Sequence, residues 1–341
     1  MKAHAQAVVI GGGVVGCSIL YHLAKIGWRD VVLVEQNEVT SGSTWHAAGG
    51  VTTLNSDANV SRLQKYTFDL YSELEQVTGL SCGIHHNGGI YLAASDGQTD
   101  FLKLIHSRAR YLGMETELIS VAEAKKRNVL IAEEYFQRAL WREDGGHVDP
   151  WLTTQAYVAA AKLHGAEVHR FTKALALVER ANGSWDVVTD RGIVHAEHVV
   201  NAGGLWAREV GRLVGIQLPV LAMEHHYIVT EKVPELDRLE REIINTTDFA
   251  GEIYLRQEGQ GVLLGTYEQG CTAWAEAGTP DGFHSQLLPD DLDRIAPELE
   301  RGFKHFPAVG WVGIKKVING FFMFSPDGNP LVGPVKGLRN F

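Results

Sequence analysis

One short segment of the chain surrounds a reactive side chain with very small residues. The segment GSTWHAAGG, residues Gly42–Gly50, contains Trp45 and His46 within a run of glycine, serine and alanine. Small residues let a backbone come close to a flat or charged group. A single histidine in this setting fits three roles: it packs, it makes a hydrogen bond, or it is a point of covalent attachment.

A glycine-rich turn near the start of the chain has the spacing typical of a dinucleotide site. It follows Ala7–Ile10, a short apolar run without alternation that predicts a buried parallel strand. Apolar residues then recur at helical spacing up to Ile26, and Gly27 predicts the end of that helix. The glycines at the GxGxxG positions are Gly11, Gly13 and Gly16. In this arrangement a pyrophosphate lies at the helix N-terminus, where free N–H groups and the helix dipole favour negative charge.

An acidic residue stands at the distance that such a site requires. The apolar run Val31–Glu35 predicts the next buried strand, and Glu35 comes 19 residues after Gly16. A carboxylate there accepts both hydrogen bonds of an adenosine ribose diol, and it disfavours NADP because it repels the 2′-phosphate. The fingerprint does not separate NAD from FAD. The small-residue loop that follows favours FAD, because it suits a second close approach to a larger cofactor.

Several segments together resemble one group of flavoenzymes. GGGVVG, VEQNEVT and GSTWHAAGG are similar to the dimethylglycine and sarcosine dehydrogenase group, above all to the dimethylglycine dehydrogenases, within the D-amino-acid-oxidase-like superfamily. The resemblance covers nearly the whole chain. It continues in GHVDPWLTTQAYVAAAKLHGAEV (146–168), VVNAGGLWAREVG (199–211), MEHHYIVT (223–230), YLRQEGQGVLLGTYE (254–268) and SPDGNPLVGP (325–334).

The resemblance implies how FAD is held. In that group the histidine of the WHAAG motif carries FAD covalently on a ring nitrogen, and the matching residue is His46. The resemblance also places Ala174 and Trp206 against FAD, with Ala202 and Gly203 as further points of close approach. The residues that we expect to contact FAD are therefore Gly11, Gly13, Val14, Val15, Gly16, Glu35, Gln36, Gly42, Ser43, Thr44, Trp45, His46, Ala47, Ala48, Gly49, Gly50, Ala174, Ala202, Gly203 and Trp206.

The resemblance further implies oxidation of an N-methylated glycine, of the dimethylglycine or sarcosine type. The amine must be neutral, since a protonated nitrogen has no lone pair to assist C–H cleavage, so the site needs a proton acceptor or a hydrogen-bond network. The family places a histidine and a tyrosine near the flavin, and the matching residues are His225 and Tyr254. His226 is expected to point away, because neighbours on a strand face opposite sides. Candidates to bind the substrate carboxylate are Arg62, Arg256 and Lys315.

The later steps of such a reaction involve parts outside this sequence. The iminium product hydrolyses to formaldehyde or passes its carbon to tetrahydrofolate, which the family binds in a C-terminal domain. No part of that domain is present, and the ending SPDGNPLVGPVKGLRNF predicts a flavin domain cut short before its last strand and helix. Oxygen and an electron-transfer flavoprotein both fit as electron acceptors.

The expected fold is α/β, with a Rossmann-like FAD-binding domain interleaved with a mixed-sheet substrate domain, as in the D-amino-acid-oxidase-like enzymes. We assign residues 1–85, 145–217 and 320–341 to the FAD-binding domain, which is incomplete at its C-terminal end. Residues 86–144 and 218–319 are assigned to the substrate domain.

Local patterns predict several of the elements that position these residues. Ser61–Gly79 is expected to form an amphipathic helix. Its apolar face would carry Leu63, Tyr66, Leu70, Leu74 and Val77. Asp149 and Pro150 predict the start of another helix, which Gly165 ends. Asn182–Gly183 predicts the turn of a hairpin.

Composition and charge exclude several kinds of partner. The 341 residues include 31 Lys and Arg against 41 Asp and Glu, a net charge of −10, which argues against binding nucleic acid or an anionic membrane surface. No run reaches the about 18 apolar residues of a membrane-spanning helix. The N-terminal residues show no secretory signal, so we expect a bacterial cytoplasmic or mitochondrial matrix protein. The three cysteines are expected to be small buried hydrophobes in a reducing compartment: Cys17, Cys82 and Cys271.

Three other interpretations are weaker. The pair His85–His86 is not expected to hold a metal, because adjacent strand residues face opposite sides and no cluster of Cys or carboxylate completes a site. A non-catalytic regulatory subunit of a phosphatase resembles the same family but lacks the attachment histidine, so the presence of His46, His225 and Tyr254 favours an enzyme. A nicotinamide-dependent dehydrogenase is disfavoured by the WHAAG loop.

Overall fold

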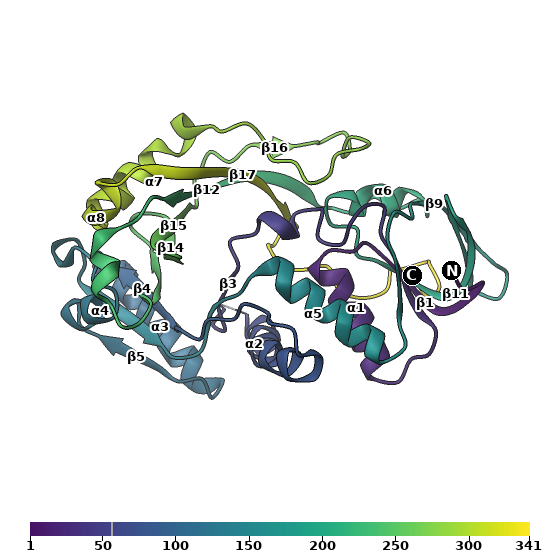
Figure 1. The fold of residues 1–341 in the computed structure, drawn as a ribbon, viewed down its shortest axis with the longest axis horizontal. Coiled ribbons are helices and arrows are strands. Elements are labelled where there is room, and N and C mark those ends of the chain that lie inside the picture. Colours follow the sequence, from purple (N-terminus) through teal and green to yellow (C-terminus); the bar gives the residue numbers. More distant parts are fainter. Residues whose placement is uncertain (56) are drawn as a thin grey trace.

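Two large β-sheets organise the chain, one in each of two lobes (Figure 1). The computed structural model describes residues 1–55 and 57–341. One lobe contains both termini, and the other contains most of the later strands and α7 (Leu292–His305). This α/β architecture with mixed sheets agrees with the predicted fold class.

The sheet of the first lobe has six strands in the order β8-β2-β1-β11-β10-β9. The strands are β1 His4–Ile10, β2 Val31–Val34, β8 Glu167–His169, β9 Ala174–Glu179, β10 Trp185–Thr189 and β11 Gly192–Asn201. The first four strands in this order are parallel to one another, and β9–β10 is the predicted hairpin. The helices of this lobe are α1 Val14–Lys25, α5 Pro150–Leu163 and α6 Ala207–Arg212.

The helix at Pro150 follows the predicted signals. The Asp149 carboxylate accepts a hydrogen bond from the Leu152 amide at 2.9 Å, and Pro150 occupies the first helical turn. Gly165 lies just beyond the helix with a φ of +85°, a conformation that glycine adopts without steric cost. α5 packs beside α1, and the two helices cover one face of the sheet with a shared apolar core.

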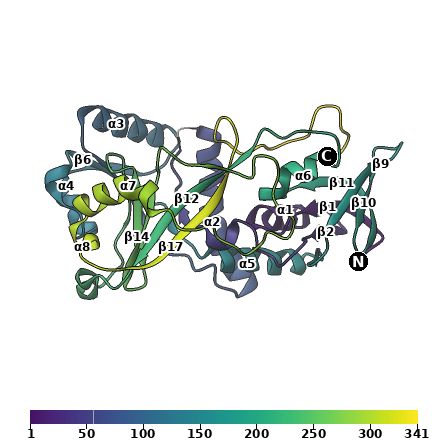
Figure 2. The same cartoon turned by 90° about the horizontal axis from the view of Figure 1, so that it is seen from above.

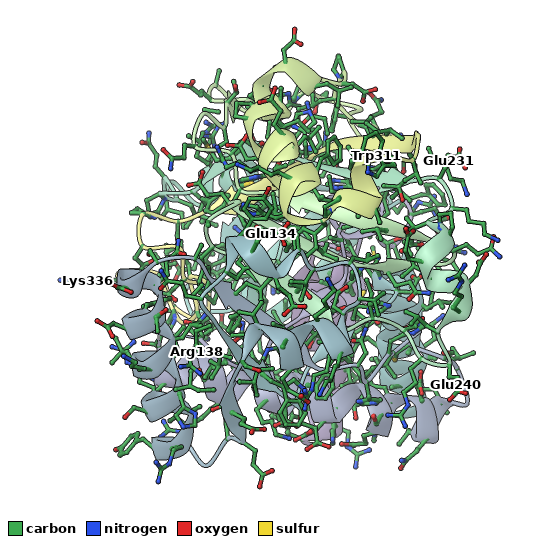
Figure 3. The ribbon with its side chains drawn as sticks, turned by 90° about the vertical axis from the view of Figure 1, so that its left-hand side faces the viewer. Glu134, Arg138, Glu231, Glu240, Trp311 and Lys336 are labelled. Carbon is green, nitrogen blue, oxygen red and sulfur yellow. The ribbon has the colours of Figure 1, made fainter. Side chains whose placement is uncertain are left out.

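The second lobe is built on a nine-stranded mixed sheet (Figure 2). Its strands are β4 Gly89–Ala93, β5 Thr116–Ile119, β6 Arg138–Arg142, β12 Leu221–Thr230, β13 Asn245–Asp248, β14 Ile253–Glu258, β15 Gly261–Thr266, β16 Ala273–Trp274 and β17 Ile314–Phe324. Only β13 and β4 pair in parallel; the other pairs are antiparallel. Its other helices are α3 Asp96–Tyr111, α4 Val121–Arg127 and α8 Pro307–Gly310. Figure 3 views this lobe from its outer end, where Glu134, Arg138, Glu231 and Glu240 are exposed.

A short strand pair and a long helix lie between the two lobes. β3 (Gly50–Val51) pairs with β7 (Gly146–His147), so the end of the small-residue loop meets the segment that leads into α5. The long helix α2 (Ala58–Thr78) packs against α5. β17 runs across residue 320 without interruption, so the assignment of residues 320–341 to the FAD-binding domain stays a proposal, as does the rest of the division.

The apolar face predicted for α2 is partly wrong. Leu70 and Leu74 are buried, but Leu63, Tyr66 and Val77 are each about half exposed. Phe68 and Tyr71 are buried instead, because these rings turn toward the core and shift the buried stripe around the helix. Cys17 and Cys82 are buried as expected, whereas Cys271 is only partly buried in a loop.

None of the helices within residues 1–55 and 57–341 combines the length and the apolar character that crossing a bilayer demands.

The close approach of α1 to the strand before it predicts a strict need for glycine at position 16. A Cβ added to Gly16 would lie 1.9 Å from the carbonyl oxygen of Gly11, which is backbone and cannot move aside. We expect Gly16→Ala to lower the free energy of unfolding by about 1–3 kcal/mol, measured by urea denaturation. Gly97→Ala in α3 is the control: nothing lies within 4 Å of its added Cβ, and stability should be unchanged or slightly higher. Equal stability of Gly16→Ala and wild type would contradict the packing.

Candidate active site

A cavity at the end of the six-stranded sheet gathers Glu35, predicted to bind the adenosine ribose, with other residues predicted to contact FAD. Its volume is about 290 Å³. Six of the predicted FAD residues line it: Gly11, Glu35, Gln36, Ala174, Gly203 and Trp206. They come from β1, β2, the start of β9 and the turn after β11, which the sheet order brings side by side. The gathering of these residues supports the prediction that this cavity holds the adenosine end, which stays a proposal.

The Glu35 carboxylate is held in place by backbone amides. Gly12 N donates to Oε2 at 2.6 Å and Asn37 N donates to Oε1 at 2.7 Å. Burial raises the pKa of Glu35, while these amide hydrogen bonds oppose the shift. A carboxylate has about four acceptor positions, so two remain for a ribose diol.

The small-residue loop lies against the N-terminus of α1. Thr44 Oγ1 accepts a hydrogen bond from Val14 N at 3.1 Å, and a Cβ added to Gly13 would lie 3.2 Å from the same oxygen. The Ser43 hydroxyl is buried and has no hydrogen-bond partner among the described residues, which suits a polar group of a ligand. A Cβ added to Gly42 would touch Trp206 at 3.7 Å, so the loop also meets the adenosine cavity.

Not every residue of the predicted set is equally placed for a cofactor. Val15 is 61% exposed on α1, on the side away from the core. Gly16 and Ala202 are packed against protein backbone, because a Cβ on Gly16 would also meet the Ala202 side chain at 3.3 Å. Trp45 lines a second cavity, of about 850 Å³. None of the predicted FAD residues that line the first cavity lines this one. The remaining residues of the loop, Ala47, Ala48, Gly49 and Gly50, line a third cavity, described below.

His46 is buried beneath the backbone of β17. Its exposed fraction is 5%, and its Nε2 atom has no hydrogen-bond partner among the described residues. A Cβ added to Gly320 would lie 2.4 Å from Nδ1 of His46, so only glycine allows β17 to pass this close. Burial lowers the pKa of His46 to about 4, which keeps the imidazole neutral at pH 7. A neutral ring with an unpartnered nitrogen fits a point of covalent attachment.

The two predicted catalytic residues lie beside His46. A small cavity of about 20 Å³ is lined by His46, His225 and Tyr254 together. His225 stands opposite Gly320 in the β12–β17 pair, and this register brings it to His46. The Tyr254 ring crosses β15 at Gly265, where an added Cβ would lie 2.1 Å from the ring. Neither glycine could be recognised from the sequence, because the contacts are between strands far apart in the chain.

A buried carboxylate, Glu268, pairs with His225. His225 Nδ1 lies 3.2 Å from Glu268 Oε2, and Thr266 Oγ1 donates to the same oxygen at 2.9 Å. Burial opposes ionisation of Glu268, but the hydrogen bonds from His225 and His226 outweigh it and lower its pKa to about 2. The sequence prediction did not include Glu268, since no spacing rule links it to His225.

The expectation that His226 points away and has no part in the site needs correction. His226 is fully buried, and its Nδ1 lies 3.7 Å from Glu268 Oε1. Arg294 Nη2 lies 3.1 Å from the same Nδ1, and Asp291 N donates to Nε2 at 3.2 Å. Alternation along the strand gives the two histidines different further partners. Both side chains nevertheless reach Glu268, because it lies beside the strand. His226 also lines the small cavity together with His225, so it is not a neutral control.

A larger cavity, the candidate substrate pocket (the large pocket), adjoins the small one. It has a volume of about 630 Å³ and shares Ala48, Tyr254 and Phe322 with the small cavity. Its other lining residues include Tyr91, Arg142, Thr247, Arg256 and Tyr267. Of the three cations predicted to bind the substrate carboxylate, only Arg256 lines it. Arg62 is exposed on α2, and Lys315 is exposed and lines the second cavity.

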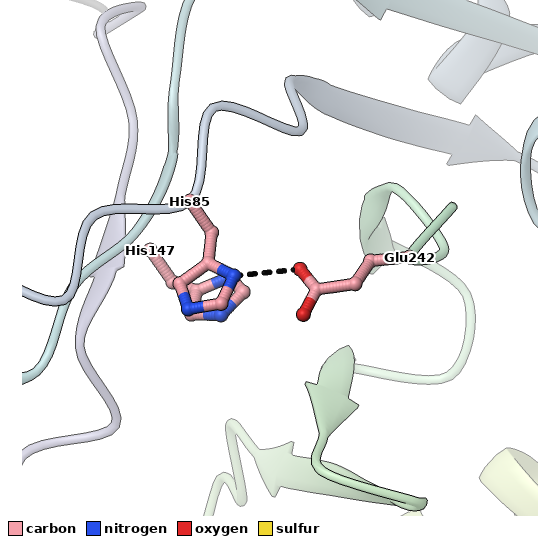
Figure 4. A group of neighbouring side chains, drawn as sticks. All are labelled: His85, His147 and Glu242. Atoms are coloured by element: carbon pink, nitrogen blue, oxygen red, sulfur yellow. Dashed lines mark hydrogen bonds and ion pairs between the residues drawn. The ribbon is translucent and has the colours of Figure 1, made fainter. Parts of the chain in front are cut away.

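Three residues outside this pocket form a group that the sequence did not predict. His85 Nδ1 lies 2.9 Å from a carboxylate oxygen of Glu242, and one ligand atom from each of His85, His147 and Glu242 lie within 4.8 Å of one another (Figure 4). The sequence predicted no cluster of Cys or carboxylate to complete a site at His85–His86, whereas His85 lies beside His147 and Glu242. The two imidazoles stack, with centroids 4.3 Å and planes 12° apart. Because a metal ion binds in the plane of an imidazole, both rings would have to turn to share one ion, and we assign no metal to the group.

The chain belongs to the FAD dependent oxidoreductase family, whose model matches residues 6–341. This match and the arrangement of the sheets confirm the predicted class of flavoprotein, with FAD as its cofactor. The solved structure of L-proline dehydrogenase from P. horikoshii superposes with a TM-score of 0.85 at 25% identity, covering 100% of this chain and 87% of that one.

Among relatives of known activity, mouse dimethylglycine dehydrogenase is 39% identical, covering 100% of this chain and 40% of the relative. Human sarcosine dehydrogenase is 34% identical, with 100% and 37% covered. The regulatory subunit of mouse pyruvate dehydrogenase phosphatase is 30% identical, with 98% and 38% covered. The chain thus spans about 40% of the length of the dimethylglycine dehydrogenase that it matches.

The Glu35 geometry leads to a test of the adenosine cavity. Glu35→Ala is expected to weaken FAD binding by about 1–3 kcal/mol, because ribose hydroxyls would lose their charged acceptor. The measurement is the flavin content of purified protein, or the rate of flavin uptake where attachment is covalent. Glu38→Ala is the control, since Glu38 is exposed and pairs with Arg170 at 2.9 Å. Wild-type flavin content in Glu35→Ala would show that the assignment is wrong.

Proposed function

We propose that this chain is the flavin-binding part of an enzyme that oxidises an N-methylated glycine, of the dimethylglycine or sarcosine type. One observation carries the proposal: His46, His225 and Tyr254, which lie 29 to 208 residues apart, line the same small cavity beside the large pocket. The likeness to dimethylglycine and sarcosine dehydrogenases supports the choice of substrate class.

FAD, when bound, accepts the two electrons and the hydrogen of the N-methyl C–H bond. The residues of this chain have the task of keeping the amine neutral and in position. Ionised Glu268 accepts a hydrogen bond from Nδ1 of His225, which leaves Nε2 of that ring to accept a proton from the amine. His225 in this role is a proton acceptor whose ring is oriented by a buried carboxylate.

Tyr254 has a different role in the proposal. Burial raises the pKa of its hydroxyl, so the phenol stays protonated and acts as a hydrogen-bond donor. Its ring lies in both cavities, between His46 and the large pocket. A donor in this position can hold a polar group of the substrate while His225 handles the proton.

His46 is proposed as the covalent attachment point of FAD. Its low pKa leaves the imidazole unprotonated and therefore nucleophilic, and its unpartnered Nε2 has no competing hydrogen bond. Ser43 and the backbone of Ala47–Gly50 would contact the rest of the ring system. Attachment would both retain the flavin and change its electronic properties.

The remaining steps belong to the whole protein. Water adds to the iminium carbon, and the resulting carbinolamine breaks into formaldehyde and the demethylated amine; alternatively, tetrahydrofolate in a further domain takes the carbon. Oxygen or an electron-transfer flavoprotein reoxidises the flavin. Anaerobic mixing of the holoprotein with dimethylglycine, sarcosine and other N-methyl amino acids tests the proposal, and flavin that none of them reduces would favour the regulatory alternative.

The attachment proposal predicts how the flavin behaves on denaturation. In wild type, the yellow colour should stay with the protein pellet after acid precipitation. In His46→Ala the flavin should be released into the supernatant, because no bond holds it. His86→Ala is the matched control, since His86 is exposed and lies outside these cavities, and it should behave as wild type. Complete release from the wild type would contradict covalent attachment.

The roles of His225 and Tyr254 predict a loss in flavin reduction without a loss of flavin. His225→Ala should slow anaerobic reduction by substrate by at least about 100-fold and change its pH dependence, as for a lost acid–base group. Tyr254→Phe should have a smaller effect, because it removes one hydroxyl and keeps the ring. His86→Ala again serves as control. If His225→Ala reduced at the wild-type rate, the proton would be handled by another group or by water.

A further inference from the structure

The large pocket contains a buried cation that lacks a counter-ion. Arg142, at the end of β6, is 5% exposed and lines the pocket. Within residues 1–55 and 57–341, no carboxylate oxygen lies within 4 Å of its guanidinium. Arg142 donates to the carbonyl oxygen of Asp144, and its Nε is buried without a hydrogen-bond partner. An Arg keeps its charge at physiological pH, so this group is under-satisfied as it stands.

Two glycines shape a slot around this guanidinium. A Cβ added to Gly89 would lie 2.5 Å from Nη2, and one added to Gly145 would lie within the guanidinium itself, 1.7 Å from Nη1. The cation also faces the ring of Tyr91, with 5.7 Å between the guanidinium carbon and the ring centroid. The Tyr91 hydroxyl is 2.9 Å from Thr52 Oγ1, which also lines the pocket. The guanidinium is therefore held in one position at the pocket wall.

The other charged groups of the pocket already have partners. Arg256 Nη1 pairs with Glu258 at 2.6 Å, and its Nε donates to the Ala48 carbonyl at 2.9 Å, so it supports the small-residue loop. Glu252 pairs with Arg301 at 2.8 Å, and Asp248 pairs with His305 at 2.5 Å. An unpaired buried charge is destabilising, and a bound anion removes that penalty by bidentate hydrogen bonding.

We infer that Arg142 binds the carboxylate of the amino-acid substrate. This inference rests on the proposed function and names a residue outside the three cations that the sequence suggested. The pyrophosphate of FAD is expected at the N-terminus of α1 and the ribose at Glu35, both at the cavity lined by Gly11 and Glu35, so neither accounts for Arg142. With the carboxylate at Arg142, the N-methyl end of the substrate is left to face the part of the pocket that Tyr254 and Phe322 share with His46.

The test compares a ligand that carries the carboxylate with one that does not. N,N-dimethylglycine and its methyl ester are titrated into the purified full-length holoprotein under anaerobic conditions, and the dissociation constant of each is read from the flavin spectrum or from flavin reduction. The two ligands also differ in amine basicity, which affects every variant alike. The quantity compared is therefore the dissociation constant of the ester divided by that of the acid (the ester-to-acid ratio), in each variant relative to the wild type. Arg142→Met should lower this ratio about 10- to 100-fold, the range of a lost charge-assisted pair.

Two further variants separate a role in binding from a role in folding. Arg142→Lys keeps the charge without the fork and should recover part of the ratio. Gly89→Ala keeps Arg142 but displaces its guanidinium, and it should lower the ratio as well. Arg62→Met, on the exposed face of α2, should leave the ratio at its wild-type value.

The outcomes distinguish the inference from the proposed function. If the wild type binds and oxidises no N-methyl amino acid, the proposed function fails; acetate and propionate then report on the anion site, by flavin perturbation in wild type that Arg142→Met abolishes. An unchanged ester-to-acid ratio in Arg142→Met overturns the inference. A lower ester-to-acid ratio in Arg256→Met but not in Arg142→Met also overturns it. A shift of the flavin reduction potential in Arg142→Met with an unchanged ratio overturns it as well, because the guanidinium would then act on the flavin.

Discussion

The contact between the imidazole of His46 and the backbone of β17 is the constraint on which the site depends. A Cβ at Gly320 would overlap the ring, so β17 can pass this close to His46 only with glycine at position 320. Gly320 stands opposite His225 in the β12–β17 pair. One contact thus joins the small-residue loop of the first lobe to the nine-stranded sheet of the second, and it sets His46 and His225 on two sides of the same cavity.

Charge is arranged differently around His225 and in the large pocket. Near His225 the charges are paired and buried: Glu268 contacts both histidines, and Arg294 contacts His226. In the large pocket, Arg142 donates a hydrogen bond to a backbone carbonyl, and within residues 1–55 and 57–341 it forms no ion pair with a carboxylate. A paired network orients its members and resists change, whereas an uncompensated charge favours the binding of an anion. These two arrangements suit the two proposed tasks, orientation of a proton acceptor at His225 and recognition of the substrate at Arg142.

The nucleotide half of the fold could be predicted because its signals are local. Gly11, Gly13 and Gly16 lie within six residues; added Cβ atoms at Gly16 and Gly11 would meet the backbone of Gly11 and of Ala202, which follows the adjacent strand. Glu35 follows at a distance set by one helix and one strand. The six-stranded sheet, its βαβ order and the hairpin at Asn182–Gly183 agree with these expectations. The apolar face of α2 was partly wrong because the bulky rings of Phe68 and Tyr71 decided which side of the helix is buried.

The sequence by itself determined the class of protein, and it named the motif expected to hold FAD and the pair His225 and Tyr254 as candidates, since these depend on short spacings or on a family motif. Only the tertiary structure decided that Gly320 and Gly265 are needed, that Glu268 contacts His225 and His226, and that Arg142 is the unpaired cation of the pocket. The reason is physical. These relations join strands that are neighbours in a sheet but distant in the chain, and no local propensity encodes which carboxylate or glycine meets a given side chain.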